Sequence, residues 1–216
     1  MSVDVERPVE SELPDRADLL LASASPRRRE LLERVGLTLR VSAPDVDETP
    51  REGEPAADYV RRMAADKLAA ARAAAGATEL PVLAADTIVI LQGRILGKPR
   101  DRSDAAQMLG RLAGHRHEVT TAYRIALGAR EIDRAVTTTV AFRLLDPREL
   151  EAYLACEEWQ GKAGAYAVQG VAAAFVTELR GSLTNVVGLP LAEVLADLRA
   201  LGALPAYPPP RYPRVA

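Results

Sequence analysis

Apolar and polar positions alternate along the chain in two patterns, which predict an α/β fold. Short apolar runs bounded by turn residues are typical of strands, whereas apolar residues three and four positions apart are typical of amphipathic helices. The runs predict strands over Leu19–Ala22, Leu39–Ser42, Pro81–Leu91, Arg94–Leu96, His115–Leu127, Arg130–Phe142 and Val171–Leu179. The spacing predicts a helix that begins at Pro26 and further helices over Pro55–Ala75, Arg102–Leu112, Asp146–Glu157 and Pro190–Leu201.

The order of these elements indicates how the sheet is built. Strands and helices alternate first, and a long predicted hairpin about Gly128 follows, so we expect α/β architecture with an antiparallel insertion. Glycine-rich loops are expected over Gly161–Gly170 and Gly181–Gly188. The result is an elongated mixed β-sheet flanked by helices.

Composition and charge narrow the function. The chain has 216 residues, 48% of them hydrophobic and 27% charged, which suits one compact domain. We expect residues 17–202 to form that domain, with two lobes around a central cleft. A disordered N-terminal tail over residues 1–16 and a proline-rich tail over residues 203–216 should flank it. The net charge of −2 argues against a nucleic-acid or anionic-membrane partner, so any anion is expected to bind locally.

Cysteine usage and the N-terminus indicate a compartment. Cys156 is the single cysteine, so no disulfide can form within the chain, and we expect it to pack in a helix. The acidic N-terminus has no apolar signal region, and no apolar run approaches the roughly 18 residues that span a bilayer. These features favour a soluble cytoplasmic protein.

The segment Leu20–Leu32 carries positive charge where a helix disfavours it. Ser25 suits the N-cap, Pro26 suits the first turn, and three arginines then crowd the positive end of the helix dipole. Free N–H groups together with the guanidinium groups of Arg27 and Arg28 would bind phosphate. The alternative is a solvated basic turn whose charge is balanced by nearby glutamates, Glu30 and Glu33.

Asp86 interrupts an apolar row in a predicted buried strand. Strand alternation places it on one face with Val82, Ala84, Ile88 and Ile90, so its carboxylate needs a partner such as a metal, a lysine or a reacting water. Such a site can tune a carboxylate for general-base work. The alternative is an aspartate bonded to backbone at a bulge.

Two lysines and an acidic loop add candidate ligands. Lys67 lies in the apolar stripe of its predicted helix, where a side chain that reaches out to water is the ordinary explanation. Lys98 follows a glycine that could aim it into a cleft, although a turn lysine is usually solvated. The acidic loop that holds Glu48 could supply a ligand to a divalent cation or could simply be solvated. We expect His115 and His117 to be structural, because two histidines make a weak zinc site.

Seven motifs in register resemble those of the Maf family of nucleoside triphosphate pyrophosphatases. They are SASPRR at Ser23–Arg28, Glu48, Lys67 in DKLAAA, AADTIV at Ala84–Val89, GKP at Gly97–Pro99, KAGAYAVQG at Lys162–Gly170 and NVVGLP at Asn185–Pro190. The resemblance covers about Leu19 to Leu198. It implies hydrolysis of a nucleoside triphosphate to the monophosphate and pyrophosphate, a fold related to the inosine triphosphate pyrophosphatases, and a possible homodimer.

The resemblance also implies residue roles. Asp86 resembles the proton acceptor of the family, and Glu48 with Asp86 would hold a divalent cation, Mg²⁺ or Mn²⁺. The residues that resemble its phosphate contacts are Ser25, Arg27, Lys67 and Lys98, and we expect Arg28 to join them.

The KAGAYAVQG motif is similar to that of the branch that acts on dTTP and UTP, where Arg27, Thr87 and Gln169 are linked to base choice. Gly161 and Leu183-Thr184 depart from the family pattern, which leaves acceptance of CTP or modified pyrimidines open. A nucleotide-binding regulator or cell-division inhibitor with little turnover, and a pyrophosphatase of different base specificity, are the alternatives.

Overall fold

A computed structural model describes residues 17–204. Seven strands form one sheet in the order β2-β1-β3-β5-β6-β7, with β4 paired to β3. They are β1 (Leu19–Ala22), β2 (Leu39–Ser42), β3 (Val82–Leu91), β4 (Arg94–Leu96), β5 (Arg116–Leu127), β6 (Arg130–Phe142) and β7 (Val176–Arg180). β1 is parallel to β2 and β3, and the other pairs are antiparallel. The predicted mixed sheet is confirmed.

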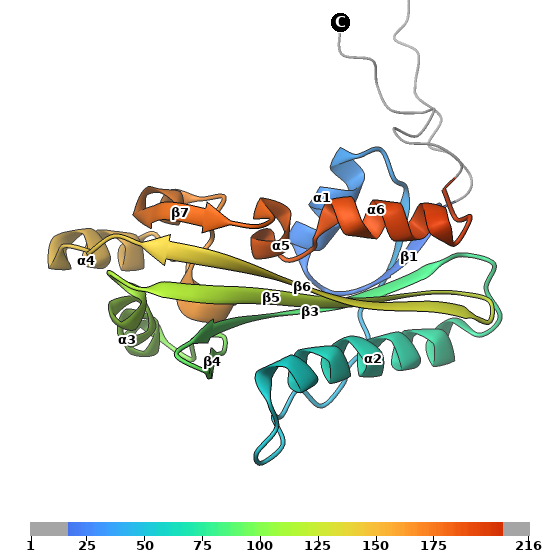
Figure 1. Cartoon of the computed structure of the whole chain (residues 1–216), viewed down its shortest axis with the longest axis horizontal. Coiled ribbons are helices and arrows are strands. Elements are labelled where there is room, and N and C mark those ends of the chain that lie inside the picture. Colours follow the sequence, from blue (N-terminus) through green and yellow to red (C-terminus); the bar gives the residue numbers. More distant parts are fainter. Residues whose placement is uncertain (1–16, 205–216) are drawn as a thin grey trace, which may run out of the picture.

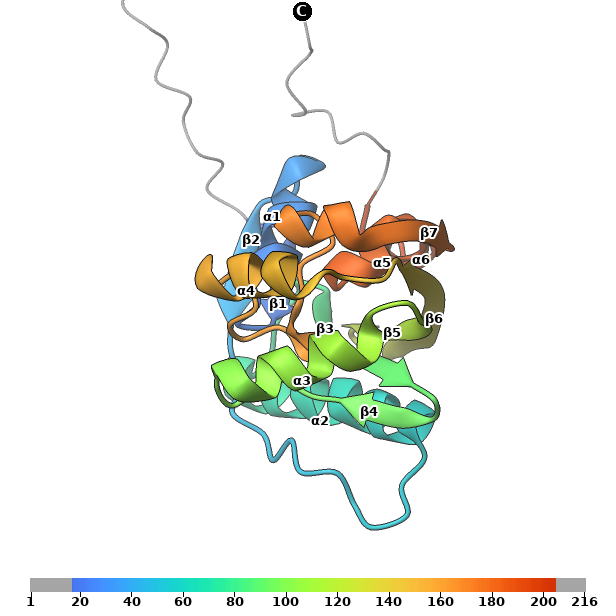
Figure 2. The same cartoon turned by 90° about the vertical axis from the view of Figure 1, so that its left-hand side faces the viewer.

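Helices cover both faces of this sheet (Figure 1). They are α1 (Pro26–Arg34), α2 (Ala56–Ala75), α3 (Arg102–Leu112), α4 (Pro147–Ala155), α5 (Leu183–Val187) and α6 (Leu191–Ala200). The apolar stripe of α2 packs on one face of β3 and β5, whereas α1 and α6 pack on the opposite face. α3 and α4 lie together at one end of the sheet (Figure 2).

One edge of β3 has a gap. The other edge pairs with β5 from Val82 to Ile90 without interruption. On the gapped edge, β1 pairs with Val82–Ala84 and β4 pairs with Val89–Leu91, and no strand among residues 17–204 pairs with the positions between. The carboxyl ends of β1 and β4 both stop beside this gap. The segments that follow these two strands are therefore brought to the same place.

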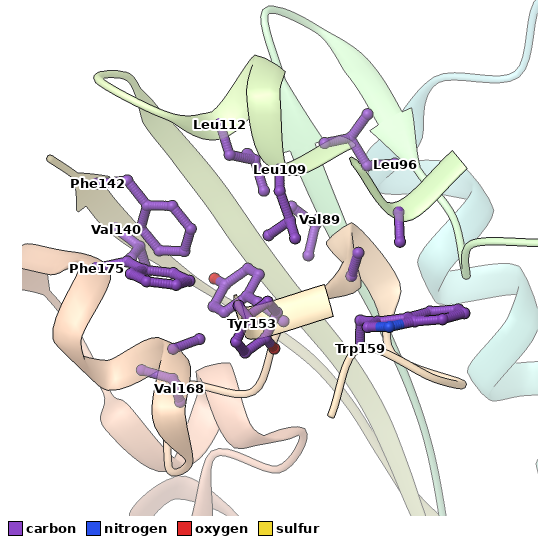
Figure 3. Close-up of a cluster of buried hydrophobic side chains, with 14 of the residues drawn as sticks. Val89, Leu96, Leu109, Leu112, Val140, Phe142, Tyr153, Trp159, Val168 and Phe175 are labelled. Atoms are coloured by element: carbon purple, nitrogen blue, oxygen red, sulfur yellow. The ribbon is translucent and has the colours of Figure 1, made fainter. Parts of the chain in front are cut away.

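Apolar clusters lie on both sides of the gap along the sheet. The cluster in Figure 3 packs α3, α4 and the chain around Val168 and Phe175 against the β4 end of the sheet. A second cluster packs α1 and α6 against β1 and the matching part of β3 and β5. The two packed ends correspond to the expected lobes on either side of a central cleft.

The segment after Gly170 is the main error in the predicted elements. A strand is expected over Val171–Leu179, but Val171–Phe175 is a 3-10 helix and β7 occupies only Val176–Arg180. The Glu158 carboxylate accepts the N–H groups at the start of this turn, a tertiary contact that local sequence does not reveal. The expected loop Gly181–Gly188 likewise contains the short helix α5, capped by the Ser182 side chain.

Three smaller expectations also change. α4 ends at Ala155, and Cys156 after it is exposed, so the prediction that this cysteine packs in a helix is wrong. Leu204, expected in the C-terminal tail, is buried in the cluster of α1 and α6. Apart from Ala203 and Leu204, the two expected tails lie outside the described residues. Within residues 17–204, no helix is both long and apolar enough to cross a membrane.

Candidate active site

The nine residues that the sequence links to substrate, cation or base choice all line one cleft of about 300 Å³ at the gap in β3. Because Asp86 and Thr87 are neighbours on a strand, their side chains point to opposite faces of the sheet. Both reach the same cleft because no strand closes the edge of β3 there. The predicted residues that the cleft brings together are Ser25, Arg27, Arg28, Glu48, Lys67, Asp86, Thr87, Lys98 and Gln169.

Lys67 joins two carboxylates on the α2 face of the sheet. Its Nζ lies 2.6 Å from Oδ1 of Asp86 and 2.7 Å from Oε1 of Glu48. Only 11% of the Lys67 side chain and 14% of the Asp86 side chain are exposed. The buried-strand aspartate therefore has a lysine partner, which was one of the expected options. The ordinary explanation for Lys67, an ammonium group that reaches out to solvent, is therefore wrong.

Glu48 is the most exposed member of this group. It follows β2 in an extended loop, and the Tyr59 hydroxyl of α2 donates to its carbonyl oxygen at 2.9 Å. Lys98 Nζ lies 3.7 Å from the second carboxylate oxygen. Burial alone would raise the pKa of Glu48, but hydrogen bonds and charge from Lys67 and Lys98 outweigh it and lower that pKa. Glu48 is thus held ionised at the mouth of the cleft.

The N-terminus of α1 forms the opposite, basic side. Ser25 is the N-cap residue, as predicted, and its side chain makes no capping hydrogen bond. Arg27 is half-buried and its Nε donates to the Val187 carbonyl at 3.2 Å. Arg29, by contrast, is exposed and pairs with Glu33 at 2.7 Å. The solvated alternative therefore describes Arg29 and does not describe Arg27.

Arg28 is a buried cation that only uncharged oxygens contact. Its side chain donates to the Gly188 carbonyl at 2.8 Å and to the hydroxyls of Ser23 and Thr87, each at 2.9 Å. Within the described chain, no carboxylate lies within salt-bridge distance of it. Burial lowers the pKa of Arg28, and the more distant charge of Asp86 opposes that shift. A guanidinium in this position is expected to favour an anion nearby.

Asn185 is a positioning residue that the sequence motif did not explain. Its buried amide donates to the Val119 carbonyl and the Thr138 hydroxyl, each at 2.9 Å, and so fixes α5 on the sheet. Gly188 follows α5 with a φ of 132°, a conformation that favours glycine, and its carbonyl binds Arg28. The Gly188 carbonyl lies beside α1 because of the fold, and the local sequence around it does not reveal this contact.

The segment Gly161–Gln169 forms the remaining wall and adds a cation that sequence reasoning missed. Lys162 lines the cleft, and desolvation together with the positive charge of Arg27 lowers its pKa. The signal was present in the KAGAYAVQG motif, but the lysine there was given no role. Gln169 is exposed on the same wall. The Gly164 N–H donates to the Gly97 carbonyl at 3.1 Å, which ties this wall to the segment that carries Lys98.

His117 is structural, as expected. It is buried and lies 2.8 Å from the hydroxyl of Tyr166, and it packs edge-on against Phe142. Burial lowers its pKa to about 4. His115 is exposed, and its Nδ1 lies 2.8 Å from the Ala113 carbonyl oxygen. The part of the chain that the structure describes has no cluster of three or more histidine, cysteine, aspartate or glutamate side chains that could hold a metal.

In the cleft, the carboxylates and most of the cations lie on different sides. Carboxylates lie on the α2 side, and cations from α1, the Lys98 loop and the Lys162 wall surround them. The fold and the cleft therefore define an α/β protein with a cation-lined cleft suited to a polyanion.

Comparisons with known proteins narrow this class. The model of the Maf-like protein family matches residues 18–201. The dTTP/UTP pyrophosphatase of Cereibacter sphaeroides is 51% identical over 190 residues, which cover 88% of this chain and 97% of that protein. The protein of the same name from Anaeromyxobacter dehalogenans strain 2CP-1 is 53% identical over 189 residues, which cover 85% of this chain and 94% of that protein. The chain belongs to the Maf-like protein family.

A solved structure, that of the Staphylococcus aureus Ham1 protein, matches 85% of this chain and 98% of its own with a TM-score of 0.49 and 14% identity.

Proposed function

We propose that this protein hydrolyses dTTP and UTP to the monophosphate and pyrophosphate. The relatives at 51% and 53% identity carry the name of that activity. The observation that carries the proposal is the cleft itself, where two carboxylates face several cations at a break in the sheet. A triphosphate offers negative charge to the cations, and its scissile α-phosphorus needs an activated water.

In this proposal Asp86 is the base. Its carboxylate accepts a proton from the water that attacks the α-phosphorus, and Lys67 holds that carboxylate in place at 2.6 Å. Water oxygen forms a bond to the phosphorus as the bond to the bridging oxygen of pyrophosphate breaks. Arg27, Lys98 and Lys162 neutralise the charge that develops on the departing pyrophosphate.

A divalent cation, Mg²⁺ or Mn²⁺, fits this site. Glu48 and Asp86 converge on a single atom, Lys67 Nζ, so both carboxylates lie close enough to serve one cation. Mg²⁺ is commonly bound by one or two carboxylates with phosphate oxygens and waters supplying the other ligands. Glu48 and Asp86 would hold it. When bound, the cation supplies charge neutralisation at the phosphates.

The base end of the cleft is assigned to Gln169, and Arg27 and Thr87, which are also linked to base choice, lie beside Arg28 on the α1 side. A primary amide both donates and accepts hydrogen bonds, and this matches the N–H and carbonyl edge that uracil and thymine share. Gln169 is exposed on the cleft wall, where a base can reach it. The Thr87 hydroxyl lies within hydrogen-bond distance of Arg28, Thr121 and Gly188, so we assign it the placement of Arg28 more than direct base contact.

The test is a nucleotide panel in water enriched in ¹⁸O. The protein is incubated with dTTP, UTP, CTP, dGTP and ATP, with Mg²⁺, with Mn²⁺ and with chelator, and products are separated by chromatography. We expect pyrophosphate, label in the monophosphate, a preference for dTTP and UTP, and strong loss of rate with chelator. Equal rates on purine nucleotides would contradict the base assignment, and labelled inorganic phosphate would contradict attack at the α-phosphorus.

Binding of dTTP without turnover in the same panel would favour the nucleotide-binding regulator. The homodimer and the cytoplasmic location stay predictions, and light scattering of the purified protein tests the first of these.

A further inference from the structure

The base-selecting wall depends on a side chain outside every motif that pointed to function. Gln169 has an exposed side chain, so its position must be set by the backbone around it. Before it, Val168 is buried in the apolar cluster of α3 and α4. After it, the chain turns directly into the 3-10 helix at Val171. The second of these anchors is made by Glu158.

The Glu158 carboxylate binds the backbone just beyond Gln169. One oxygen accepts the Val171 N–H at 3.0 Å, and the other accepts the Ala172 N–H at 3.3 Å. Both bonds bridge 13 or 14 residues of sequence, so they connect the end of α4 to the end of the cleft wall. A charged acceptor on two backbone donors is a strong local restraint.

Gly170 is the seat for this carboxylate. A Cβ built on Gly170 would lie 1.7 Å from Glu158 Oε1 and 2.4 Å from Cδ, which no real contact allows. The φ of Gly170 is −110°, so the glycine is required for space and not for a left-handed backbone. The obstructing atoms are the far end of a flexible side chain. Any side chain at position 170 would therefore expel the carboxylate and leave the rest of the fold in place.

The chain that carries Glu158 is itself firmly held. Glu157 adopts a φ of 58°, which turns the chain sharply after α4. Trp159 is buried, and its indole N–H donates to the Leu154 carbonyl at 3.0 Å. Glu158 thus extends from a fixed support, and it binds backbone N–H groups that are two and three residues past the exposed glutamine.

We infer that Glu158 is a positioning residue for base selection, which acts by seating on Gly170 and holding the backbone that orients Gln169. This inference rests on the proposed function, because it assigns the means by which the same cleft discriminates between bases. Glu158 itself is not placed against the substrate. Its loss should therefore alter discrimination and KM more than the rate of the chemical step.

The experiment measures kcat and KM of the full-length protein on dTTP and dGTP for Glu158→Ala, Glu158→Gln, Gly170→Ala and the double variant Glu158→Ala/Gly170→Ala. We expect Glu158→Ala and Gly170→Ala each to lower the dTTP-to-dGTP ratio of kcat/KM by roughly tenfold, mainly through KM. Glu158→Gln keeps a carbonyl acceptor and should retain most of the ratio. The double variant should be no worse than either single variant, because both remove the same contact.

Glu151→Ala is the matched control, since Glu151 is an exposed glutamate of α4 that pairs with Arg102. Thermal unfolding is measured on every variant. Unchanged discrimination in Glu158→Ala and Gly170→Ala, with or without a lower melting temperature, would overturn the inference and leave a purely structural turn. A wild-type protein that fails to discriminate between dTTP and dGTP would instead overturn the proposed function, so the two failures are distinct.

Discussion

The two faces of β3 at the gap treat charge in opposite ways. On the Asp86 face, the Lys67 ammonium lies between two carboxylates at 2.6 and 2.7 Å, so every charge has a partner of opposite sign. On the Thr87 face, Arg28 is bound by two hydroxyls and a carbonyl and has no carboxylate within reach in the described chain. The cleft therefore has one side whose charges pair with each other and one side whose cation favours an added anion.

Two further polar groups on the Thr87 face, Thr121 and His117, carry no charge. Thr121 pairs with Thr87 across the sheet, and His117 lies four residues earlier on the same strand and hence on the same face. Burial lowers the pKa of His117 to about 4, so this imidazole stays neutral. We therefore expect two residues of the Thr87 face to have separate roles. Arg28 favours an anionic ligand, and the buried His117 makes the stability of the fold sensitive to acid.

The largest expected effect tests the Asp86 face. Asp86→Asn should lower kcat for pyrophosphate release from dTTP by roughly 10²–10⁴, because an amide cannot accept the proton of water. Nucleotide binding, measured by calorimetry, should persist. Asp133→Asn is the control, since Asp133 is another strand aspartate that pairs with arginines but lies away from the cleft. Near-normal turnover of Asp86→Asn would contradict its assignment as the base.

The next effect tests whether His117 on the Thr87 face stays neutral. The pKa of His117 is about 4 when folded and 6.5 in the reference state. Since the folded value is the lower one, the contribution of His117 is fully present above pH 6.5. It is lost as the pH falls toward 4, because the unfolded chain then takes up a proton that the folded chain refuses. The loss should amount to about 3 kcal/mol.

His117→Phe removes this proton uptake. Denaturant unfolding from pH 7 to pH 4 should show a shallower loss of stability in His117→Phe than in the wild type. His115→Gln, which changes the exposed histidine, is the matched control. Parallel curves for the wild type and His117→Phe would mean that this face does admit a proton.

The smallest effect compares the two faces by one substitution on each, Lys67→Met and Arg28→Met. Lys67→Met leaves two carboxylates without their shared partner, and we expect it to lower the free energy of unfolding by about 2 kcal/mol, discounted for the exposure of Glu48. Arg28→Met removes the unfavourable desolvation of a buried charge and also the favourable hydrogen bonds of that charge. These two contributions should nearly cancel, so the free energy of unfolding should change by no more than about 1 kcal/mol. A larger loss in Arg28→Met than in Lys67→Met would reverse the comparison.

The sequence indicated the unusual residues better than it indicated their partners. An aspartate in an apolar strand and a lysine in an apolar helical stripe were visible as anomalies, because periodicity defines what belongs on each face. That they contact each other depends on how α2 crosses β3, which local pattern does not encode. The three consecutive arginines likewise looked alike, although Arg28 is buried and Arg29 is exposed.

The errors have a common physical origin in contacts between distant segments. The 3-10 helix at Val171 replaces a predicted strand because Glu158 binds its first N–H groups. Arg28 finds the Gly188 carbonyl 160 residues away in the sequence. Apolar periodicity predicted the long elements, such as β5, to within a residue. Short turns held by distant side chains were the parts it could not predict.

The missing stretch of ladder beside Asp86 has a consequence for protein engineering. Extending both β1 and β4 by two residues would complete the backbone pairing of β3 and close the opening, even if every side chain discussed above were retained. A redesign that added these backbone hydrogen bonds to stabilise the sheet would therefore close the cleft to a ligand that enters from the edge of β3.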